Sequence, residues 1–146
     1  MYQTYRIICG RLSYACAAVG NSDSYMKRIL VIEDDLLMIH VVELIIKKEG
    51  HHADLAYNGK EAAMLLGSYD YDLVIADLKL PFPHLDELSA QLRAQRGRRS
   101  LPVIMILPAY FVMDSISSWF GMEAEEIIIR PFSPLELTTK IQALLN

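Results

Sequence analysis

Four short, uninterrupted runs of apolar residues constrain this chain more than any other feature. They occupy residues 29–32, 73–76, 103–107 and 127–129. A strand with one face in water alternates apolar and polar residues, whereas a strand covered by helices on both faces is apolar throughout. The runs therefore predict buried strands of a parallel sheet. A weaker segment, residues 53–57, supplies a fifth strand.

Segments with helical spacing separate these runs. In the first, Leu37, Val41, Leu44 and Ile45 recur at helical intervals, and Gly50 follows as a stop signal. Further helices are predicted at residues 85–95 and at about 110–122, and two more open at residues 58–60 and at residue 133, the last with a Ser-Pro-Leu-Glu capping box. The residues expected to face the core are Ala62, Leu65, Leu66, Leu88, Leu92, Leu137, Ile141 and Leu144. Five strand-helix repeats predict an α/β fold with a doubly wound parallel sheet.

Residues 1–25 lack clear periodicity and are treated as a tail, followed by one domain at residues 26–146. Arg11 interrupts the one apolar segment that resembles an export signal, and no small-residue cleavage site follows it. A translation start placed too far upstream and a short functional extension both explain the segment equally well. The tail is expected to be poorly ordered, with residues 21–24 as its linker.

Composition excludes several classes of protein. With 14 basic and 18 acidic residues, the net charge of −4 argues against binding along a nucleic-acid backbone. The two cysteines lack companion ligands, so no metal or redox motif is supported. No apolar run approaches the roughly 20 residues of a membrane-spanning helix. We expect a cytoplasmic protein that does not bind membranes.

Acidic residues follow two of the predicted strands. Glu33, Asp34 and Asp35 come directly after the first run, and Asp77 after the third. The carboxyl ends of parallel strands share one sheet edge, where ligand crevices form. Two charges ~4 Å apart repel by roughly 4 kcal/mol at an effective dielectric of ~20, so converging carboxylates call for a cation. Without nearby His or Cys, these oxygens suit Mg²⁺.

Arg130 follows the last run and adds a fixed positive charge to the same edge. A divalent ion and a basic side chain around a free carboxylate are suited to phosphoryl transfer onto that carboxylate. In a simpler interpretation, the first three acids cap the first helix and Asp77 is a solvated turn residue. A glycine-rich nucleotide loop and the Asp-x-Asp of hydrolytic phosphatases are both missing after the first run.

From Met26 onward the chain resembles the receiver domain of two-component response regulators. The resemblance is carried by residues 28–35, 72–81, 101–105 and 130–137. It implies a flavodoxin-like (βα)5 fold with strand order 2-1-3-4-5, and Asp77 as the acceptor of a phosphoryl group. It also implies that Asp34 binds Mg²⁺ directly, that Glu33 does so through water, and that the Lys79 carbonyl is a further ligand. The implied partners are a histidine kinase or phosphotransfer protein, and a downstream target on the face of helix four, strand five and helix five.

The sequence departs from this family at three places. The family has a Thr or Ser hydroxyl at the end of strand four, where this chain has Leu107 or Pro108, depending on the register. Arg130 replaces a lysine, which keeps the charge but changes its shape. Residues 82–85 replace a usual Asp-Gly pair. Because Arg130 could grip a phosphate or pair permanently with Asp77, both alternatives stay open.

Two functions are compatible with this sequence. In the first, the chain is a single-domain response regulator that is phosphorylated on Asp77 and signals through protein contacts. In the second, it is a degenerate receiver that binds partners without phosphorylation. Since one helix follows Arg130 before the sequence ends, we expect output through a partner and no enzymatic activity beyond self-catalysed phosphoryl transfer.

Overall fold

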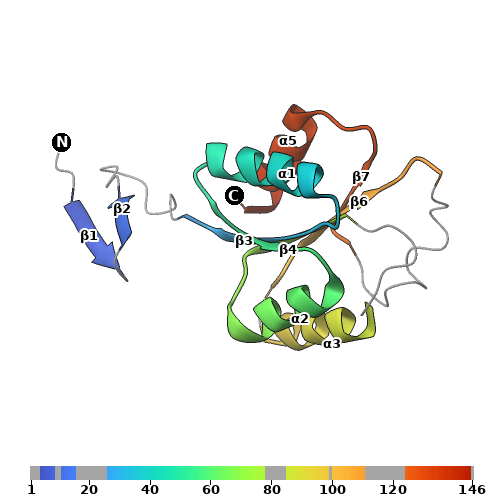
Figure 1. The fold of residues 1–146 in the computed structure, drawn as a ribbon, viewed down its shortest axis with the longest axis horizontal. Coiled ribbons are helices and arrows are strands. Elements are labelled where there is room, and N and C mark those ends of the chain that lie inside the picture. Colours follow the sequence, from blue (N-terminus) through green and yellow to red (C-terminus); the bar gives the residue numbers. More distant parts are fainter. Residues whose placement is uncertain are drawn as a thin grey trace.

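In the computed structural model of this chain, residues 4–8, 11–15, 26–77, 85–98, 100–110 and 124–145 are described. Five parallel strands among them form one sheet, with order β4-β3-β5-β6-β7 (Figure 1). The strands are β3 (Arg28–Ile32), β4 (His52–Ala56), β5 (Leu73–Asp77), β6 (Val103–Leu107) and β7 (Glu126–Ile129). Numbered along this sheet's own strands, the order is 2-1-3-4-5, and the predicted flavodoxin-like fold is confirmed.

Burial explains why three of the four apolar runs form the centre of the sheet, as β3, β5 and β6, whereas the fourth forms the edge strand β7. Every residue of β5 and β6 is buried, whereas β4, at one edge, is mostly only partly buried. Edge strands have a sheet neighbour on one side only, so β4 needs fewer apolar residues. This is why the sequence signal for β4 was the weakest of the five.

Helices cover both faces of the sheet (Figure 1). The helices α1 (Leu36–Lys48) and α5 (Pro134–Leu145) lie on one face, and α2 (Gly59–Ser68) and α3 (Leu85–Arg96) on the other. Alternate strand residues enter two separate cores, because successive side chains point to opposite faces of a sheet. Leu30 and Ile32 pack into the core under α2 and α3, and Ile29 and Val31 into the core under α1 and α5.

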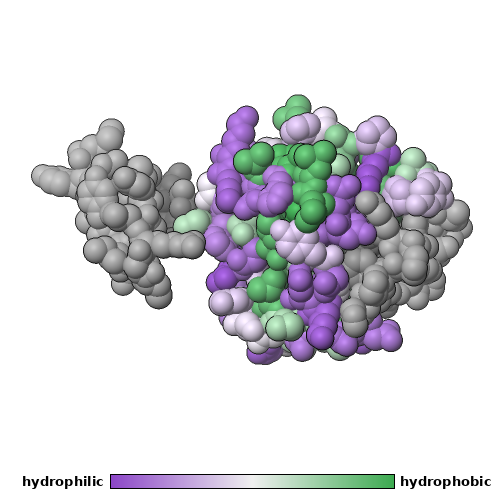
Figure 2. Space-filling model, viewed as in Figure 1, coloured by the Kyte–Doolittle hydropathy of each residue, from purple (hydrophilic) through white to green (hydrophobic). Residues whose placement is uncertain are grey.

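Most of the α1 residues noted for their helical spacing lie on the exposed side of the helix. Leu37, Val41 and Leu44 have exposed fractions of 77%, 37% and 66%, and the buried residues are Ile39, Val42, Ile45 and Ile46. Nine of the 13 residues of α1 are apolar, so apolar residues at helical spacing occur on more than one side of the helix. Figure 2 shows the result as a hydrophobic area on the surface over α1.

The other predicted helix faces are confirmed. Ala62 and Leu66 of α2, Leu88 and Leu92 of α3, and Leu137 and Ile141 of α5 are all buried, and Leu65 and Leu144 pack against them from partly exposed positions. Ser133 caps α5 by accepting a hydrogen bond from the Glu136 backbone N–H at 3.1 Å. The helix predicted at residues 110–122 lies outside the described residues, except for Tyr110, which is in a turn.

The N-terminal segment contains two strands that the sequence analysis did not predict. β1 (Thr4–Ile8) pairs with β2 (Arg11–Ala15) in antiparallel register, as a two-stranded sheet distinct from the five-stranded one. Nothing in the sequence pattern of residues 1–25 distinguished these strands from a tail. Among the described residues, no helix is long and apolar enough to cross a membrane.

Candidate phosphoacceptor site

The sheet register brings the first and third predicted strand ends together. β3 pairs with β5 so that Ile32 lies opposite Ala76, which places Glu33 and Asp77 next to each other at the carboxyl edge. Both side chains are almost fully buried, with exposed fractions of 1% and 3%. The alternative interpretation of Asp77 as a solvated turn residue is therefore wrong. Two carboxylates this deeply buried require compensating charge.

Arg130 supplies that charge from the end of β7. Its Nη2 lies 3.2 Å from Oε2 of Glu33 and forms an ion pair with Oδ1 of Asp77. The Arg130 backbone N–H donates to the Leu107 carbonyl at 2.9 Å, which fixes the start of this side chain against β6. One guanidinium group thus joins two buried carboxylates, which come from the first and third strands of the sheet.

The three consecutive acids after β3 have different environments. Oε1 of Glu33 accepts a hydrogen bond from the Asp35 backbone N–H at 2.9 Å. Asp35 is the N-cap of α1, and its Oδ1 accepts from the Leu37 and Met38 backbone N–H groups at 2.9 Å each. Asp34, between them, is exposed at the same edge. The simpler capping interpretation is correct for Asp35, whereas Glu33 belongs to the buried site.

The donor atoms at this edge fit Mg²⁺. Oδ2 of Asp77 is buried and has no hydrogen-bond partner among the described residues, and an unpaired buried carboxylate oxygen is costly. Across the described part of the chain, no three or more His, Cys, Asp or Glu side chains are grouped to hold a metal. Mg²⁺ usually keeps several waters and takes only one or two carboxylates, so a preformed cage is not required. The predicted Lys79 ligand lies outside the described residues.

The end of β6 is apolar. Leu107 is its last residue, pairs with Ile129 of β7, and is fully buried in the core under α2 and α3. Pro108 follows it and is partly buried. The strand thus ends without a hydroxyl group at either position, and Pro108 also has no backbone N–H to donate.

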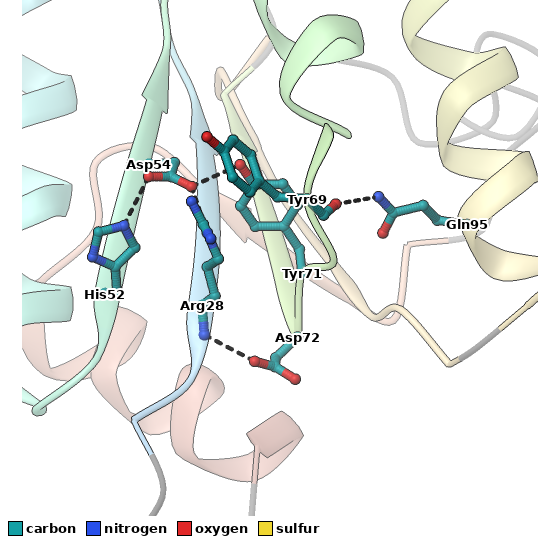
Figure 3. Close-up of polar contacts among 7 residues, drawn as sticks. All are labelled: Arg28, His52, Asp54, Tyr69, Tyr71, Asp72 and Gln95. Carbon is teal, nitrogen blue, oxygen red and sulfur yellow. Dashed lines mark hydrogen bonds and ion pairs between the residues drawn. The ribbon is translucent and has the colours of Figure 1, made fainter. Parts of the chain in front are cut away.

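A second charged cluster lies at the amino edge of the sheet (Figure 3). Oδ2 of Asp54 accepts from Arg28 Nε at 2.7 Å and from the Tyr71 hydroxyl at 2.8 Å, and Oδ1 contacts His52 Nε2 at 2.8 Å. The Arg28 guanidinium also stacks on the Tyr69 ring, 3.8 Å from its centre. Sequence reasoning missed this cluster because its members come from three separate segments.

The hydrogen bonds in this cluster affect the pKa of Asp54 more than its burial does. Burial alone would raise the pKa of Asp54, but the bonds from Arg28, Tyr71 and His52 together lower it. Burial and the bond to Asp54 raise the pKa of Tyr71. Each side chain is partnered inside the cluster, which joins β3, β4 and the start of β5. We assign it a structural role.

Comparison with known proteins matches residues 29–142 to the response regulator receiver domain family. The chain belongs to this family. The transcriptional regulatory protein PmrA of Pectobacterium parmentieri is 35% identical over 119 residues, which are 82% of this chain and 52% of PmrA. This receiver domain thus spans about half the length of that curated relative.

Solved structures show the same architecture. The response regulator TrrA of Thermotoga maritima, in complex with Mg²⁺ and BeF, has a TM-score of 0.66 at 30% identity, with coverage of 82% of this chain and 100% of TrrA. The receiver domain of a Pseudomonas aeruginosa sensor histidine kinase, with a magnesium ion coordinated in its active-site cleft, has a TM-score of 0.69 at 22% identity, covering 83% and 98% of the two chains. At 22% identity, the similarity to the kinase receiver domain shows only that the two domains share a fold.

Proposed function

We propose that this receiver domain takes part in a phosphorelay by accepting a phosphoryl group on Asp77. The observation that carries the proposal is the unpaired Oδ2 of Asp77, buried at the carboxyl edge of the sheet beside Arg130. Family membership supports the same role. Arg130 holds Oδ1 of Asp77, so Oδ2, which no described residue hydrogen-bonds, is the candidate nucleophile.

The chemical step is a displacement at phosphorus. An Asp77 carboxylate oxygen forms the new O–P bond while the P–N bond of a donor phosphohistidine breaks, and the leaving imidazole nitrogen takes up a proton. The Arg130 guanidinium stabilises the negative charge on the phosphoryl oxygens, in place of the lysine ammonium that is usual in the family. When bound, Mg²⁺ neutralises further charge on those oxygens. Asp77, Asp34 and, through water, Glu33 would hold it, with the Lys79 carbonyl.

The partners follow from this role. We propose that a histidine kinase or phosphotransfer protein donates the phosphoryl group. We further propose that a downstream protein binds a face made by β7, α5 and the helix predicted at residues 110–122. The chain would act in the cytoplasm as a single-domain regulator and would catalyse nothing beyond its own phosphorylation. Support for protein partners comes from family membership, and the formal charge of −4 gives no support to a nucleic-acid partner.

A second candidate function is a binding module that works without phosphorylation. Two observations favour it. Arg130 already bridges Asp77 and Glu33, and neither Leu107 nor Pro108 has a hydroxyl for a bound phosphate, while Pro108 also has no backbone N–H. In that case the ion pair would hold the domain permanently in one state.

Beryllofluoride, a phosphoryl mimic, separates the two functions. With Mg²⁺ present, it should raise the thermal unfolding midpoint of the wild type and leave Asp77→Asn unchanged, because ligand bound to the folded state stabilises it. Asp86→Asn, at the exposed start of α3, is the matched control and should respond like the wild type. A wild type that shows no Asp77-dependent shift would favour the binding module and overturn the proposal.

A further inference from the structure

An apolar cavity adjoins the Asp77 site. Its volume is about 380 Å³, within the range of small-molecule sites. Three segments form its walls: α1, the residues after β6, and the residues after β7. The lining residues are Met38, Val41, Ile45, Pro108, Ala109, Tyr110, Arg130, Pro131, Phe132 and Pro134.

The chemistry of these walls is unusual for the neighbourhood of a phosphate site. Among the lining residues that the structure describes, Arg130 has the one charged side chain, and the Tyr110 hydroxyl is the other polar side-chain group. Three of the ten residues are proline, whose backbone φ is fixed by its ring. Rigid walls lose little conformational entropy when a ligand enters, which favours binding to a preformed cavity.

We infer that this cavity binds a small, neutral, largely aromatic molecule. This goes beyond the proposed phosphorelay function and does not depend on it. The aromatic character follows from the flat, apolar surfaces of Phe132, Tyr110 and the prolines, against which a ring can pack. A few polar atoms on the ligand would meet Tyr110 and the edge of Arg130, and such convergent polar groups orient ligands in apolar sites.

Neutrality follows from the charges at the base of the cavity. Arg130, the charged side chain among the described lining residues, already forms ion pairs with Glu33 and Asp77. A ligand anion would have to compete with these two carboxylates for the guanidinium and would lose its water against apolar walls. A ligand cation would have to be stripped of water against apolar walls.

Arg130 belongs to both the cavity and the Asp77 site. A ligand that packs against its side chain therefore changes the surroundings of the guanidinium that holds Asp77. This coupling, which does rest on the proposed function, would let a small molecule adjust the response of Asp77 to a phosphoryl group.

Fluorescence titration with N-phenyl-1-naphthylamine, a neutral aromatic probe that brightens in apolar surroundings, tests the cavity directly. The full chain should bind it saturably at one site. Ala109→Trp, which puts a large side chain into the cavity, should weaken binding at least about tenfold. Ala94→Trp, on the exposed side of α3, is the matched control and should bind as the wild type does.

The anionic analogue 8-anilinonaphthalene-1-sulfonate tests the ligand class, and should bind at least about tenfold more weakly than the neutral probe. Absence of saturable binding to the wild type, or equal binding by Ala109→Trp with an unchanged unfolding midpoint, would overturn the site. Equal binding of the two probes would overturn its preference for neutral ligands. Failure of the phosphorelay proposal would appear separately, as a missing beryllofluoride response with probe binding intact.

Discussion

At the scale of single residues, Arg130 has the largest effect on the site. Its guanidinium forms ion pairs with both Glu33 and Asp77, two carboxylates that are almost fully buried. Removing one partner of a buried ion pair is far more costly than the net value of the pair, because the other charge is left without compensation. The stability of this chain should therefore depend strongly on Arg130.

We predict that Arg130→Ala lowers the free energy of unfolding by about 3 kcal/mol. The loss should be clearly smaller when the same change is made in Asp77→Asn, because one of the two stranded carboxylates is then neutral. Urea unfolding of the wild type, both single variants and the double variant measures this coupling. An equal loss in both backgrounds would show that Arg130 does not act through Asp77.

Asp54 gives a pH-dependent prediction. Its pKa is lower in the folded chain than the ordinary value, so its carboxylate stabilises the fold at pH values above the ordinary pKa. That contribution is lost as the pH falls through the lowered, folded-state pKa. The stability difference between the wild type and Asp54→Asn should thus be greatest near neutral pH and shrink in acid.

Urea unfolding at about pH 7 and about pH 3.5 tests this dependence. At about pH 7 the free energy of unfolding of the wild type should exceed that of Asp54→Asn by about 1–3 kcal/mol. Asp86→Asn serves as the control, and its effect should stay below about 1 kcal/mol at neutral pH. A wild-type advantage over Asp54→Asn that grows as the pH falls would contradict the proposed role of the Arg28 and Tyr71 hydrogen bonds.

At the scale of elements, α1 shows both what sequence reasoning provides and where it stops. The existence of the helix and its end near Gly50 were predicted from spacing and stop signals, and α1 ends at Lys48. Its buried face was not, because the choice between two apolar faces depends on how the helix lies on the sheet. The outward face, with Leu37 and Leu44, is therefore a surface that only the structure shows.

We predict that this outward face contacts the phosphoryl donor protein. Leu44→Asp should slow phosphotransfer from a phosphohistidine protein by about tenfold or more, since a charge would be buried in the contact. Reaction with a small acyl phosphate should be unchanged, because that donor needs no protein contact. Stability should change by less than about 0.5 kcal/mol, since Leu44 is 66% exposed.

Met64→Asp is the matched control on α2, where Met64 is exposed to nearly the same extent, 65%. It should react with both donors at the wild-type rate. Equal slowing by Met64→Asp and Leu44→Asp with the protein donor would mean that the effect comes from surface charge rather than from contact at α1.

At the scale of the whole molecule, the sheet and its functional edge were predictable because continuous apolar runs dictate buried parallel strands, and acids at their ends dictate a shared edge. The adjacency of Glu33 and Asp77 followed from that logic and is seen in the register of β3 and β5. The ion pair between Arg130 and Asp77 was one of two alternatives that the sequence left open. The ion pair of Arg130 with Glu33, the adjoining cavity and the Asp54 cluster were not predicted, because they depend on side-chain directions that strand and helix periods do not specify. The paired strands β1 and β2 were also missed.

The most direct test of the central claim is the mass of the intact protein after reaction with a small acyl phosphate and Mg²⁺. We predict that the wild type gains one phosphoryl group, that the group is lost at alkaline pH as an acyl phosphate should be, and that Asp77→Asn gains none. A phosphoryl group that still appears on Asp77→Asn, or a wild type that stays unmodified while binding Mg²⁺, would contradict the assignment of Asp77 as the acceptor.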